Sequence, residues 1–546
     1  MLYAFVNHSF QKSYFKWQKI LIIINKLTQE KEITLRMGKR ERWRSRIGVI
    51  LAAAGNAVGL GNILRFPSKA ALYGGGAFMV PYFIAFLLMG LPLMIVEWVI
   101  GRYAGRHGHG SMTGILGLFF NHSNWSRILG SVGVAIPVLI CMYYIYIESW
   151  TLGFAFLSLF NQIPAPVVSS DPHEAVRPYV SFFKDYTYPS ILAYFFLLIT
   201  IAINWVVLQR GVVRGIELIA KVGMPSILLF GIFLAIVALS TRDWAGVEGL
   251  KFIYNLNFSR ITDPTVWIEA SGQIFFTLSL GMGAIAVYAS YVRPREDVVK
   301  AGFWTAGINE FIELVIGASI AIPAAFAMFS AVAIPELAKE GTFRLGFMTM
   351  PAVLMNLPFG GLVSFIWFFL LFLAALTSSL ALIQPLIALF EDEMKWEHSK
   401  AVAVAMILVT IGAHFSAFVP HFIDELDFWA GCVMLLFFGL IEIIVFIWIF
   451  GIDNFYNELK QNCTIKLPKA FVYVIAFVSP LFLLFIIYFW VIKDFGKIIM
   501  VTESTKIIAR VFIVLFLIFL SIIAVKSRKI ILRDLRYTRI IKNKEP

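Results

Sequence analysis

A long apolar run of this sequence contains two hydroxyl residues whose spacing could allow them to bind a cation. Ala374, Thr377 and Ser378 are spaced i, i+3 and i+4, so on a helix they share one face. Two hydroxyls and a backbone carbonyl on that face could serve a hard cation, which prefers oxygen ligands. A hydroxyl in such a run more often bonds back to its own helix, and spacing alone leaves that alternative open.

Carboxyl groups stand in similar apolar surroundings. Glu97, Glu148, Glu313 and Glu442 lie in runs long enough to cross a bilayer, where a carboxylate is costly and usually marks a functional pathway. Glu313 follows Asn309 by four residues and therefore shares its helical face. Glu97 and Glu442 could instead bond loose backbone groups or pair with each other.

The sequence does not group the residues that a nucleophilic or metal-dependent enzyme would need. Cys141, Cys432 and Cys463 lie far apart and form no CxxC motif. His107 and His109 stand in a basic loop without a cysteine or acidic ligand motif. We therefore expect that the protein is not an enzyme.

The composition indicates a polytopic membrane protein. Of 546 residues, 60% are hydrophobic and 14% charged, and the mean hydropathy is +0.82, whereas soluble domains carry about 25% charged residues. The net charge of +13 resides in the ends, with +8 in residues 1–46 and +6 in residues 526–546. No basic domain with interleaved aromatic residues lies outside the apolar part, so we do not expect nucleic-acid binding.

Twelve apolar segments are predicted to cross the membrane. Spans of this length must be helices, because lipid offers the backbone no hydrogen-bond partner. An even number of spans with basic ends predicts a multi-pass protein of the cell membrane with both termini in the cytoplasm. The segments are 46–72, 76–103, 127–160, 189–209, 215–240, 267–291, 300–328, 361–390, 400–420, 428–450, 470–492 and 507–526.

Two spans contain glycine clusters that predict breaks in the helix. The first contains GNAVGLGN at 55–62, and the sixth contains TLSLGMG at 277–283. Each glycine destabilises a helix by about 1 kcal/mol relative to alanine, and a broken helix at membrane depth must line a cavity. The breaks open two five-span blocks, 46–240 and 267–450, as expected for an inverted-repeat transporter with a site at the membrane midplane. Close helix packing is the alternative role for these glycines.

Several motifs resemble the neurotransmitter:sodium symporter family. They are GNAVGLGNILRFP at 55–67, YGGGAFMVPY at 73–82, YYIYIESW at 143–150, GQIFFTLSLGMGA at 272–284, TSSLALIQP at 377–385 and DELDFWAG at 424–431. The resemblance runs from about Met37 to the twelfth span. It implies an all-α, LeuT-type fold of twelve transmembrane helices, a 5+5 inverted repeat with broken helices 1 and 6.

The resemblance also divides the chain into segments. Met37 is a second plausible start, so residues 1–36 are either a basic N-terminal extension or follow from a misassigned start codon. The segments are 37–45 (cytoplasmic inner-gate segment), 46–240 (first repeat), 241–266 (extracellular loop), 267–450 (second repeat), 451–526 (spans 11 and 12) and 527–546 (basic cytoplasmic tail).

The function implied by the resemblance is sodium-coupled import of a neutral, hydrophobic amino acid such as Leu, Met or Phe. A half-helix N-terminus near Leu60 would attract the substrate carboxylate, and backbone carbonyls freed near Phe276 would accept from the ammonium group. The implied substrate contacts are Ala57, Gly59, Leu60, Gly61, Ile140, Tyr144, Phe276, Thr277, Ser279, Met282, Ser378 and Leu382. Met282 is flexible, which argues against strict leucine preference.

Two Na⁺ sites are implied by the same resemblance. The first would use Ala57, Asn62, Thr277, Asn309 and the substrate carboxylate, and the second would use Gly55, Val58, Ala374, Thr377 and Ser378. Chloride-dependent members of the family carry a small neutral residue at the position of Glu313. We therefore expect Glu313 to replace chloride, and its protonation to assist the return of the empty carrier.

Two pairs of charged residues are expected to act as latches. Arg65 and Asp427 would close the outer side, and Arg40 with Asp392, near Trp43, would close the inner side. Exposed ion pairs contribute only about 0–1 kcal/mol, so such latches can open.

Three alternatives stay open from the sequence. A sodium-dependent amino-acid sensor that does not transport, or a symporter of another small amine, would share these residues. A channel is less expected, because no ring of repeated polar residues is evident. The sequence also leaves open whether two copies pair as a homodimer.

Overall fold

The structure is a computed structural model that describes residues 43, 46–164, 172–187, 190–211, 217–329, 338, 341, 343–496, 500 and 503–542. The expected extension 1–36 and Arg40 lie outside the described residues. The chain separates into Met1–Arg42 and Trp43–Pro546, and the description below concerns the second unit.

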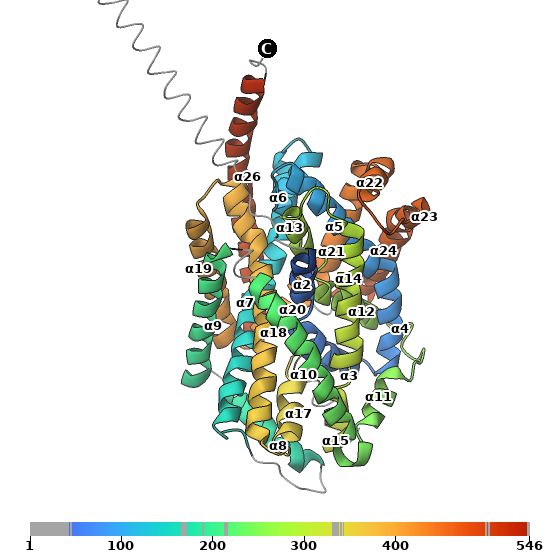
Figure 1. Ribbon diagram of the computed structural model, residues 1–546, viewed down its shortest axis with the longest axis vertical. Coiled ribbons are helices and arrows are strands. Elements are labelled where there is room, and N and C mark those ends of the chain that lie inside the picture. Colours follow the sequence, from blue (N-terminus) through green and yellow to red (C-terminus); the bar gives the residue numbers. More distant parts are fainter. Residues whose placement is uncertain are drawn as a thin grey trace, which may run out of the picture. The chain divides into compact units, whose positions relative to one another are not determined.

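The described part of the chain is helical and contains no strand, as expected for the all-α class (Figure 1). The helices before the sixth span are α2 (Arg46–Ala57), η1 (Gly61–Arg65), α3 (Phe66–Leu72), α4 (Gly76–Ala85), η2 (Phe86–Gly90), α5 (Leu91–Arg106), α6 (Met112–Phe119), α7 (Asn124–Leu159), α8 (Pro172–Thr187), α9 (Ile191–Gln209), α10 (Glu217–Trp244) and α11 (Val247–Tyr254).

The second half of the chain continues the pattern of long helices with short helices between them. Its helices are α12 (Pro264–Thr277), α13 (Ala284–Ser290), α14 (Val298–Glu310), η4 (Phe311–Gly317), α15 (Ala321–Met328), α17 (Leu345–Leu354), α18 (Gly360–Ala388), η5 (Leu389–Glu393), α19 (His398–Phe418), α20 (Phe422–Phe428), η6 (Trp429–Val433), α21 (Met434–Ile443), η7 (Ile444–Ile449), α22 (Ile452–Leu459), α23 (Lys469–Tyr473), η8 (Val474–Val478), α24 (Ser479–Trp490), η9 (Val491–Phe495) and α26 (Ser504–Lys542). The segments labelled η are π-helical turns within longer helices.

Eleven helical segments in the described part of the chain are long and apolar enough to cross a membrane. They coincide with eleven of the twelve predicted spans. The sixth predicted span is divided into α12 and α13, each too short to cross alone, because residues 278–283 leave the helix. The interruption predicted from the glycine cluster therefore accounts for the difference between eleven and twelve.

Two long helices support the centre of the molecule. α7 (36 residues) and α18 (29 residues) pack against each other, and α2 packs against α10, α14 and α18 (Figure 1). α12 packs against α4 and η6, while α13 packs against α5. The broken first and sixth spans thus lie within a shell of continuous helices.

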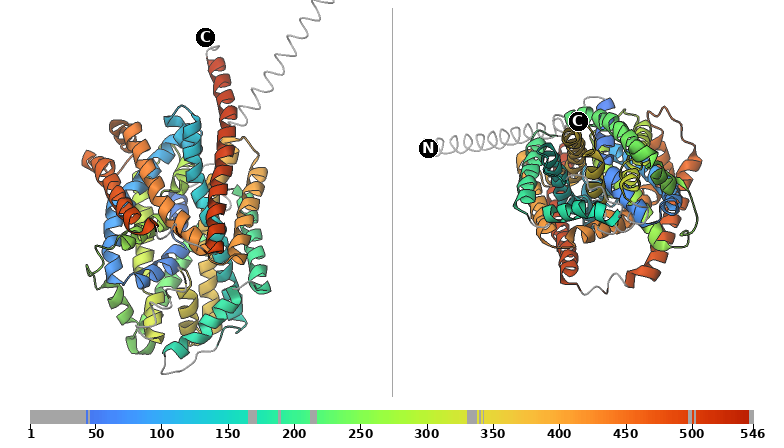
Figure 2. Two further views of the ribbon diagram at one scale, coloured as in Figure 1. Left: turned by 180° about the vertical axis from the view of Figure 1, so that it is seen from behind. Right: turned by 90° about the horizontal axis from the view of Figure 1, so that it is seen from below.

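Short helices mark the two ends of the bundle. α8, α11 and α17 lie at one end, which the predicted orientation places outside the cell and which we call the outer end. α6 and α22 lie at the opposite end, which we call the inner end (Figures 1 and 2).

Candidate functional site

The first broken helix passes close to two polar side chains. α2 ends at Ala57, Val58 and Gly59 are not helical, and η1 begins at Gly61. The Leu60 N–H donates to the Tyr144 hydroxyl at 3.1 Å. A Cβ on Gly59 would lie 2.5 Å from both the Ser378 and the Tyr144 hydroxyl oxygens, so only glycine allows this approach.

The second break uses left-handed backbone conformations. Ser279, Gly281 and Gly283 have φ values of +56°, +65° and +69° between the end of α12 and the start of α13. Glycine adopts this conformation freely, whereas Ser279 is a non-glycine residue in it, a type of strain that clusters at ligand sites. The Ser279 hydroxyl lies 3.4 Å from the Asn56 carbonyl oxygen, to which it donates. This bond joins the two broken regions.

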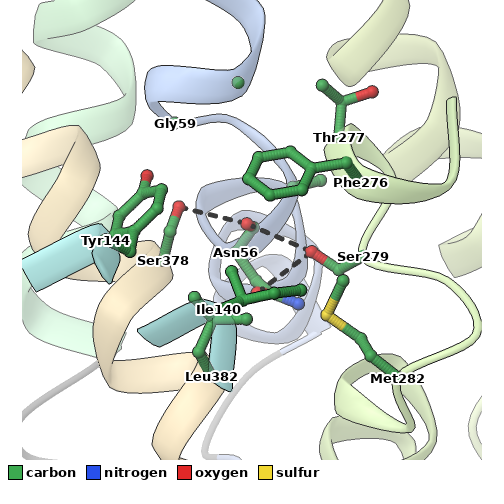
Figure 3. A pocket seen from close by; sticks show the side chains of 12 residues that line it. Asn56, Gly59, Ile140, Tyr144, Phe276, Thr277, Ser279, Met282, Ser378 and Leu382 are labelled. Carbon is green, nitrogen blue, oxygen red and sulfur yellow. Dashed lines mark hydrogen bonds between the residues drawn. The ribbon is translucent and has the colours of Figure 1, made fainter. Parts of the chain in front are cut away.

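A narrow pocket with a free volume of about 20 Å³ lies between the two breaks (Figure 3). The structure brings eleven of the twelve predicted substrate residues into its wall, and the twelfth, Leu60, bonds to Tyr144 at its edge. The pocket is lined by Asn56, Ala57, Gly59, Gly61, Ile140, Tyr144, Phe276, Thr277, Ser279, Met282, Ser378 and Leu382. All of these residues are buried.

Asn56 is a pocket residue that the sequence analysis missed. It is only 3% exposed and lies between Ser378 and Ser279 (Figure 3). The signal was present, because Asn56 is a polar residue beside the predicted break. Only backbone contacts to the substrate were predicted for this break, so the Asn56 side chain was not among the predicted contacts.

Oxygen atoms from α2 and α18 converge next to the pocket. The Thr377 hydroxyl lies 2.8 Å from both the Gly55 and the Ala374 carbonyl oxygens. The Ser378 hydroxyl lies 3.2 Å from the Asn56 carbonyl and 3.4 Å from that of Gly55. The hydroxyls thus bond both to their own helix and across to the broken one. Neutral oxygens of this kind suit a hard cation.

A second group of oxygens surrounds Asn62. Its amide nitrogen lies 2.9 Å from Asn309 Oδ1 and 2.8 Å from Glu313 Oε2, and all three residues are fully buried. Thr277 lines the adjoining pocket, and its hydroxyl donates to the Gln273 carbonyl. Asn62 and Glu313 lie in the π-helical turns η1 and η4, a geometry found frequently at functional sites.

Gln273 connects this group to the outer side. Its amide nitrogen donates to Glu313 Oε1 at 2.9 Å and to the Gly61 carbonyl at 3.1 Å, while its oxygen accepts from Arg65 at 2.6 Å. Sequence analysis did not select Gln273, because a glutamine one turn before Thr277 has no distinctive spacing. The structure places it as a bridge between Glu313 and the outer ion pair.

Arg65 and Asp427, the residues predicted as the outer latch, form an ion pair that is buried rather than exposed. Arg65 Nε lies 3.1 Å from Asp427 Oδ1, and the side chains are 0% and 3% exposed. Tyr143 also donates to Asp427 at 2.8 Å, and the Arg65 guanidinium lies 4.4 Å from the centre of the Phe276 ring. The small free-energy contribution of an exposed ion pair therefore does not apply here. Separating Arg65 from Asp427 would break hydrogen bonds between charges that are buried away from water.

A second outer ion pair was not predicted. Lys69 Nζ lies 2.7 Å from Glu269 Oε2, and the Tyr73 hydroxyl donates to Glu269 at 3.1 Å. The pair joins α3 to α12, the outer halves of the two broken spans.

Only part of the predicted inner latch falls within the described residues. Trp43 donates its indole N–H to the Tyr288 carbonyl at 3.1 Å and packs edge-on against that ring. This contact holds the chain before α2 against the end of α13. Asp392 lies in η5, and Arg40 lies outside the described residues.

Of the other intramembrane carboxylates, Glu97 has a clear structural role. It accepts from the backbone N–H groups of Gly281 at 2.8 Å and Ala286 at 3.3 Å, which belong to the second break and to α13. This agrees with the expectation that Glu97 bonds loose backbone groups. Glu148 accepts from Asn204 at 3.0 Å.

Comparisons with known proteins agree with this architecture. The sequence profile described as the sodium:neurotransmitter symporter family matches residues 40–171 and 192–531. A sodium-dependent transporter of Methanocaldococcus jannaschii is 29% identical over 472 residues, covering 82% of this chain and 90% of the relative. The sodium- and chloride-dependent taurine transporter of Rattus norvegicus is 26% identical, covering 78% of this chain and 73% of the relative.

A solved structure is also similar. The crystal structure of MhsT in complex with L-phenylalanine superposes with a TM-score of 0.73 at 29% identity, covering 82% of this chain and 99% of that chain. The match includes the LeuT-type arrangement of helices, which confirms the predicted fold. This chain belongs to the sodium:neurotransmitter symporter family and is a sodium-dependent membrane transporter.

Proposed function

We propose that the protein imports neutral, hydrophobic amino acids together with Na⁺ by alternating access, without a requirement for chloride. One observation carries this proposal. Two broken helices meet at a buried pocket whose polar wall and adjoining oxygen groups match the two charges of an amino acid and a hard cation.

The carboxylate end of the substrate fits the start of η1. The Leu60 N–H and the Tyr144 hydroxyl lie there, beside the backbone of Gly59 and Gly61, and the N-terminal end of a helix favours an anion. The ammonium group would face the carbonyl groups of Ala57, Phe276 and Thr277 and the Ser279 hydroxyl, since these residues also line the pocket. A mid-membrane zwitterion requires such partners because no water replaces them.

The remaining wall favours an apolar side chain. Ile140, Met282 and Leu382 are each less than 5% exposed and gather at one end of the pocket (Figure 3). MhsT, a structural neighbour, binds L-phenylalanine, which supports an amino acid of this class. The flexible Met282 can adapt to side chains of different shape.

We assign the two groups of oxygens to two Na⁺ ions that are transported with the substrate. The first ion would take Ala57, Asn62, Thr277, Asn309 and the substrate carboxylate. The second would take Gly55, Val58, Ala374, Thr377 and Ser378. A carboxylate shared between ion and substrate makes their binding mutually dependent, since each strengthens the other equally.

Glu313 would supply a fixed negative charge next to the first ion. Its two oxygens accept from Asn62 and Gln273, and it is fully buried. A fixed carboxylate makes a mobile anion such as chloride unnecessary. Protonation of Glu313 after Na⁺ leaves would neutralise the site and assist the return of the empty carrier.

Transport would require each side of the pocket to open in turn. The buried Arg65–Asp427 pair would close the outer side, and the segment at Trp43, which bonds to Tyr288, would close the inner side. With both termini in the cytoplasm, the Na⁺ gradient would drive the substrate inward.

The first experiment is the thermal stability of the purified full chain with each of the twenty amino acids, in Na⁺ and in K⁺. A ligand at a hundredfold excess over its Kd stabilises the folded state by about 2.7 kcal/mol. We expect Leu, Met, Phe or a similar amino acid to raise the melting temperature only in Na⁺. A lack of stabilisation by any amino acid in either salt would overturn the pocket assignment and favour another small amine.

Uptake into vesicles then separates a transporter of amino acids from a sensor. Accumulation against a concentration gradient, driven by inward Na⁺, is expected. Sodium-dependent binding without accumulation would instead identify a non-transporting sensor. Replacement of chloride by gluconate should leave uptake intact, and collapse of uptake would disprove the role given to Glu313.

A further inference from the structure

Only one of the two polar atoms in the side-chain amide of Asn56 has a hydrogen-bond partner among the described residues. Its oxygen accepts from the Ser279 hydroxyl at 3.3 Å, whereas its nitrogen has no hydrogen-bond partner among the described residues. Because Asn56 is only 3% exposed, bulk water does not reach its side-chain nitrogen. Buried amide N–H groups without a partner are rare and costly, which makes this one significant.

The backbone around Asn56 is fixed from both sides. Its carbonyl oxygen accepts from the Ser378 hydroxyl at 3.2 Å and from the Ser279 hydroxyl at 3.4 Å. These bonds come from α18 and from the second break, so the side chain has a defined position in the pocket wall. An amide held in this way is pre-organised for a ligand.

The free nitrogen lies on the apolar side of the pocket. Figure 3 shows the Asn56 amide between Ser378 and Ser279, with its nitrogen on the side of Met282. Ile140 and Leu382 lie close to it in the same view. The groups assigned to the substrate carboxylate, Tyr144 and Gly59, lie on the other side of the pocket.

We infer that Asn56 is a specificity-determining residue that hydrogen-bonds a hydroxyl on the substrate side chain, so that the pocket selects a hydroxylated neutral amino acid over its hydrocarbon counterpart. This inference rests on the proposed function and refines its substrate class. The oxygen of a substrate hydroxyl would accept a hydrogen bond from Asn56 Nδ2–H, and the hydroxyl proton could be donated to Oδ1 of the same amide. A substrate with a hydrocarbon side chain leaves this buried N–H without a partner. The cost of the unpaired group weakens binding of that substrate relative to its hydroxylated counterpart.

The test compares amino acids that differ by one hydroxyl. Tyrosine against phenylalanine and threonine against valine are measured as competitors for sodium-dependent binding to the purified full chain. We expect the hydroxylated member of at least one pair to bind about tenfold tighter or more, the factor that one hydrogen bond provides in a buried site.

Two variants then assign that preference to Asn56. Asn56→Leu has a similar volume and no polar atom, and it should bring the affinity ratio of the pair close to one or reverse it. If this variant does not fold, Asn56→Ala gives the same comparison with a smaller side chain. The matched control is Ser279→Ala, which removes the hydrogen bond to Asn56 but leaves its N–H in place. It should weaken both members of a pair by a similar factor and keep their ratio.

The outcomes separate this inference from the proposed function. If no amino acid binds in Na⁺, the proposed function itself fails. If amino acids bind but both pairs show equal affinities, or if the preference survives in Asn56→Leu and Asn56→Ala, the role given to Asn56 is wrong while the proposed function stands.

Discussion

The hydroxyl of Thr377 belongs to a group of oxygens that two helices share. It contacts the carbonyls of Gly55 on α2 and Ala374 on α18 at 2.8 Å each. A ligand in such a group contributes to ion affinity both directly and by holding the other oxygens in place. The residue therefore tests the assignment of the second Na⁺ without altering the substrate pocket directly.

Thr377→Val should weaken Na⁺ binding by about tenfold or more, because it removes an oxygen proposed to contact the ion, and even the loss of an outer contact of a bound metal costs roughly 10–100-fold. The measurement is a Na⁺ titration of amino-acid binding. Ser364→Ala is the control, because Ser364 lies on the same helix and, among the described residues, its hydroxyl contacts only the Met355 sulfur at 3.8 Å. Equal Na⁺ titrations for Thr377→Val and Ser364→Ala would contradict the assignment.

Glu313→Ser should make uptake depend on chloride. The substitution removes the buried negative charge beside Asn62 and leaves hydrogen-bond donors that a mobile anion can use. Uptake is measured in chloride and in gluconate, with the wild type as control. A variant with equal activity in both anions would show that Glu313 does not stand in for chloride.

At the scale of elements, the approach of the first break to α7 and α18 depends on one missing side chain. Gly59→Ala would place a methyl group 2.5 Å from the Tyr144 and Ser378 hydroxyl oxygens. We expect amino-acid binding to be lost while the remaining helices still form, because the clash is confined to the pocket. Gly307→Ala, on the exposed side of α14 with nothing within 4 Å of its Cβ, is the control and should bind normally. Normal binding by Gly59→Ala would show that the pocket is built differently.

The turn between α6 and α7 gives the inner end a pH dependence. Burial and the nearby Arg127 hold the pKa of His122 at about 4, well below its ordinary value. Arg127 donates to His122 Nδ1 at 2.8 Å, which requires a neutral ring, and Arg528 donates to the His122 carbonyl at 2.7 Å. His109 also opposes protonation of the ring, whereas Glu393 favours it.

Because the pKa of His122 is lower in the folded than in the unfolded state, the unfolded state binds more protons between about pH 6.5 and pH 4. The stability associated with the neutral ring is complete above about pH 6.5 and falls as the pH decreases toward 4. Melting temperatures of the wild type and His122→Gln, measured across this range, should diverge, with the wild type losing more on acidification. Parallel curves would contradict this role of His122.

At the scale of the whole molecule, apolar run length and glycine clustering were sufficient to predict the spans and both breaks. The backbone requires helices in lipid, and glycine interrupts them, so these features follow from local chemistry. The wall of the pocket followed from the family resemblance, because residues such as Ile140 and Leu382 have no local signal that places them near Ser279.

Features that depend on side-chain direction were not predicted. Asn56, Gln273 and the Lys69–Glu269 pair bond to residues about 200 or more positions away, or to more than one helix at once. Such contacts depend on how two broken helices tilt, which no local pattern encodes. The burial of Arg65 was missed for the same reason.

Under the proposed function, the burial of the Arg65–Asp427 pair makes opening of the outer side depend on temperature. Opening the outer side would hydrate the Arg65–Asp427 pair and uncover the Phe276 ring, over which the Arg65 guanidinium lies. Hydration of charges becomes less favourable on warming, and hydrophobic burial weakens on cooling. Both effects shift the carrier toward the closed form as temperature rises and toward the open form as it falls.

Cysteine labelling can follow this shift. Ser68→Cys, at a site 1% exposed near Arg65, is compared with Glu248→Cys on the exposed face of α11, after replacement of the three native cysteines. The labelling rate at position 68 relative to position 248 should increase on cooling, and a constant or falling ratio would contradict the argument. A transporter latched in this way would admit its substrate more readily at low temperature and retain it more firmly at high temperature, so that the rate of substrate entry depends on the surrounding temperature.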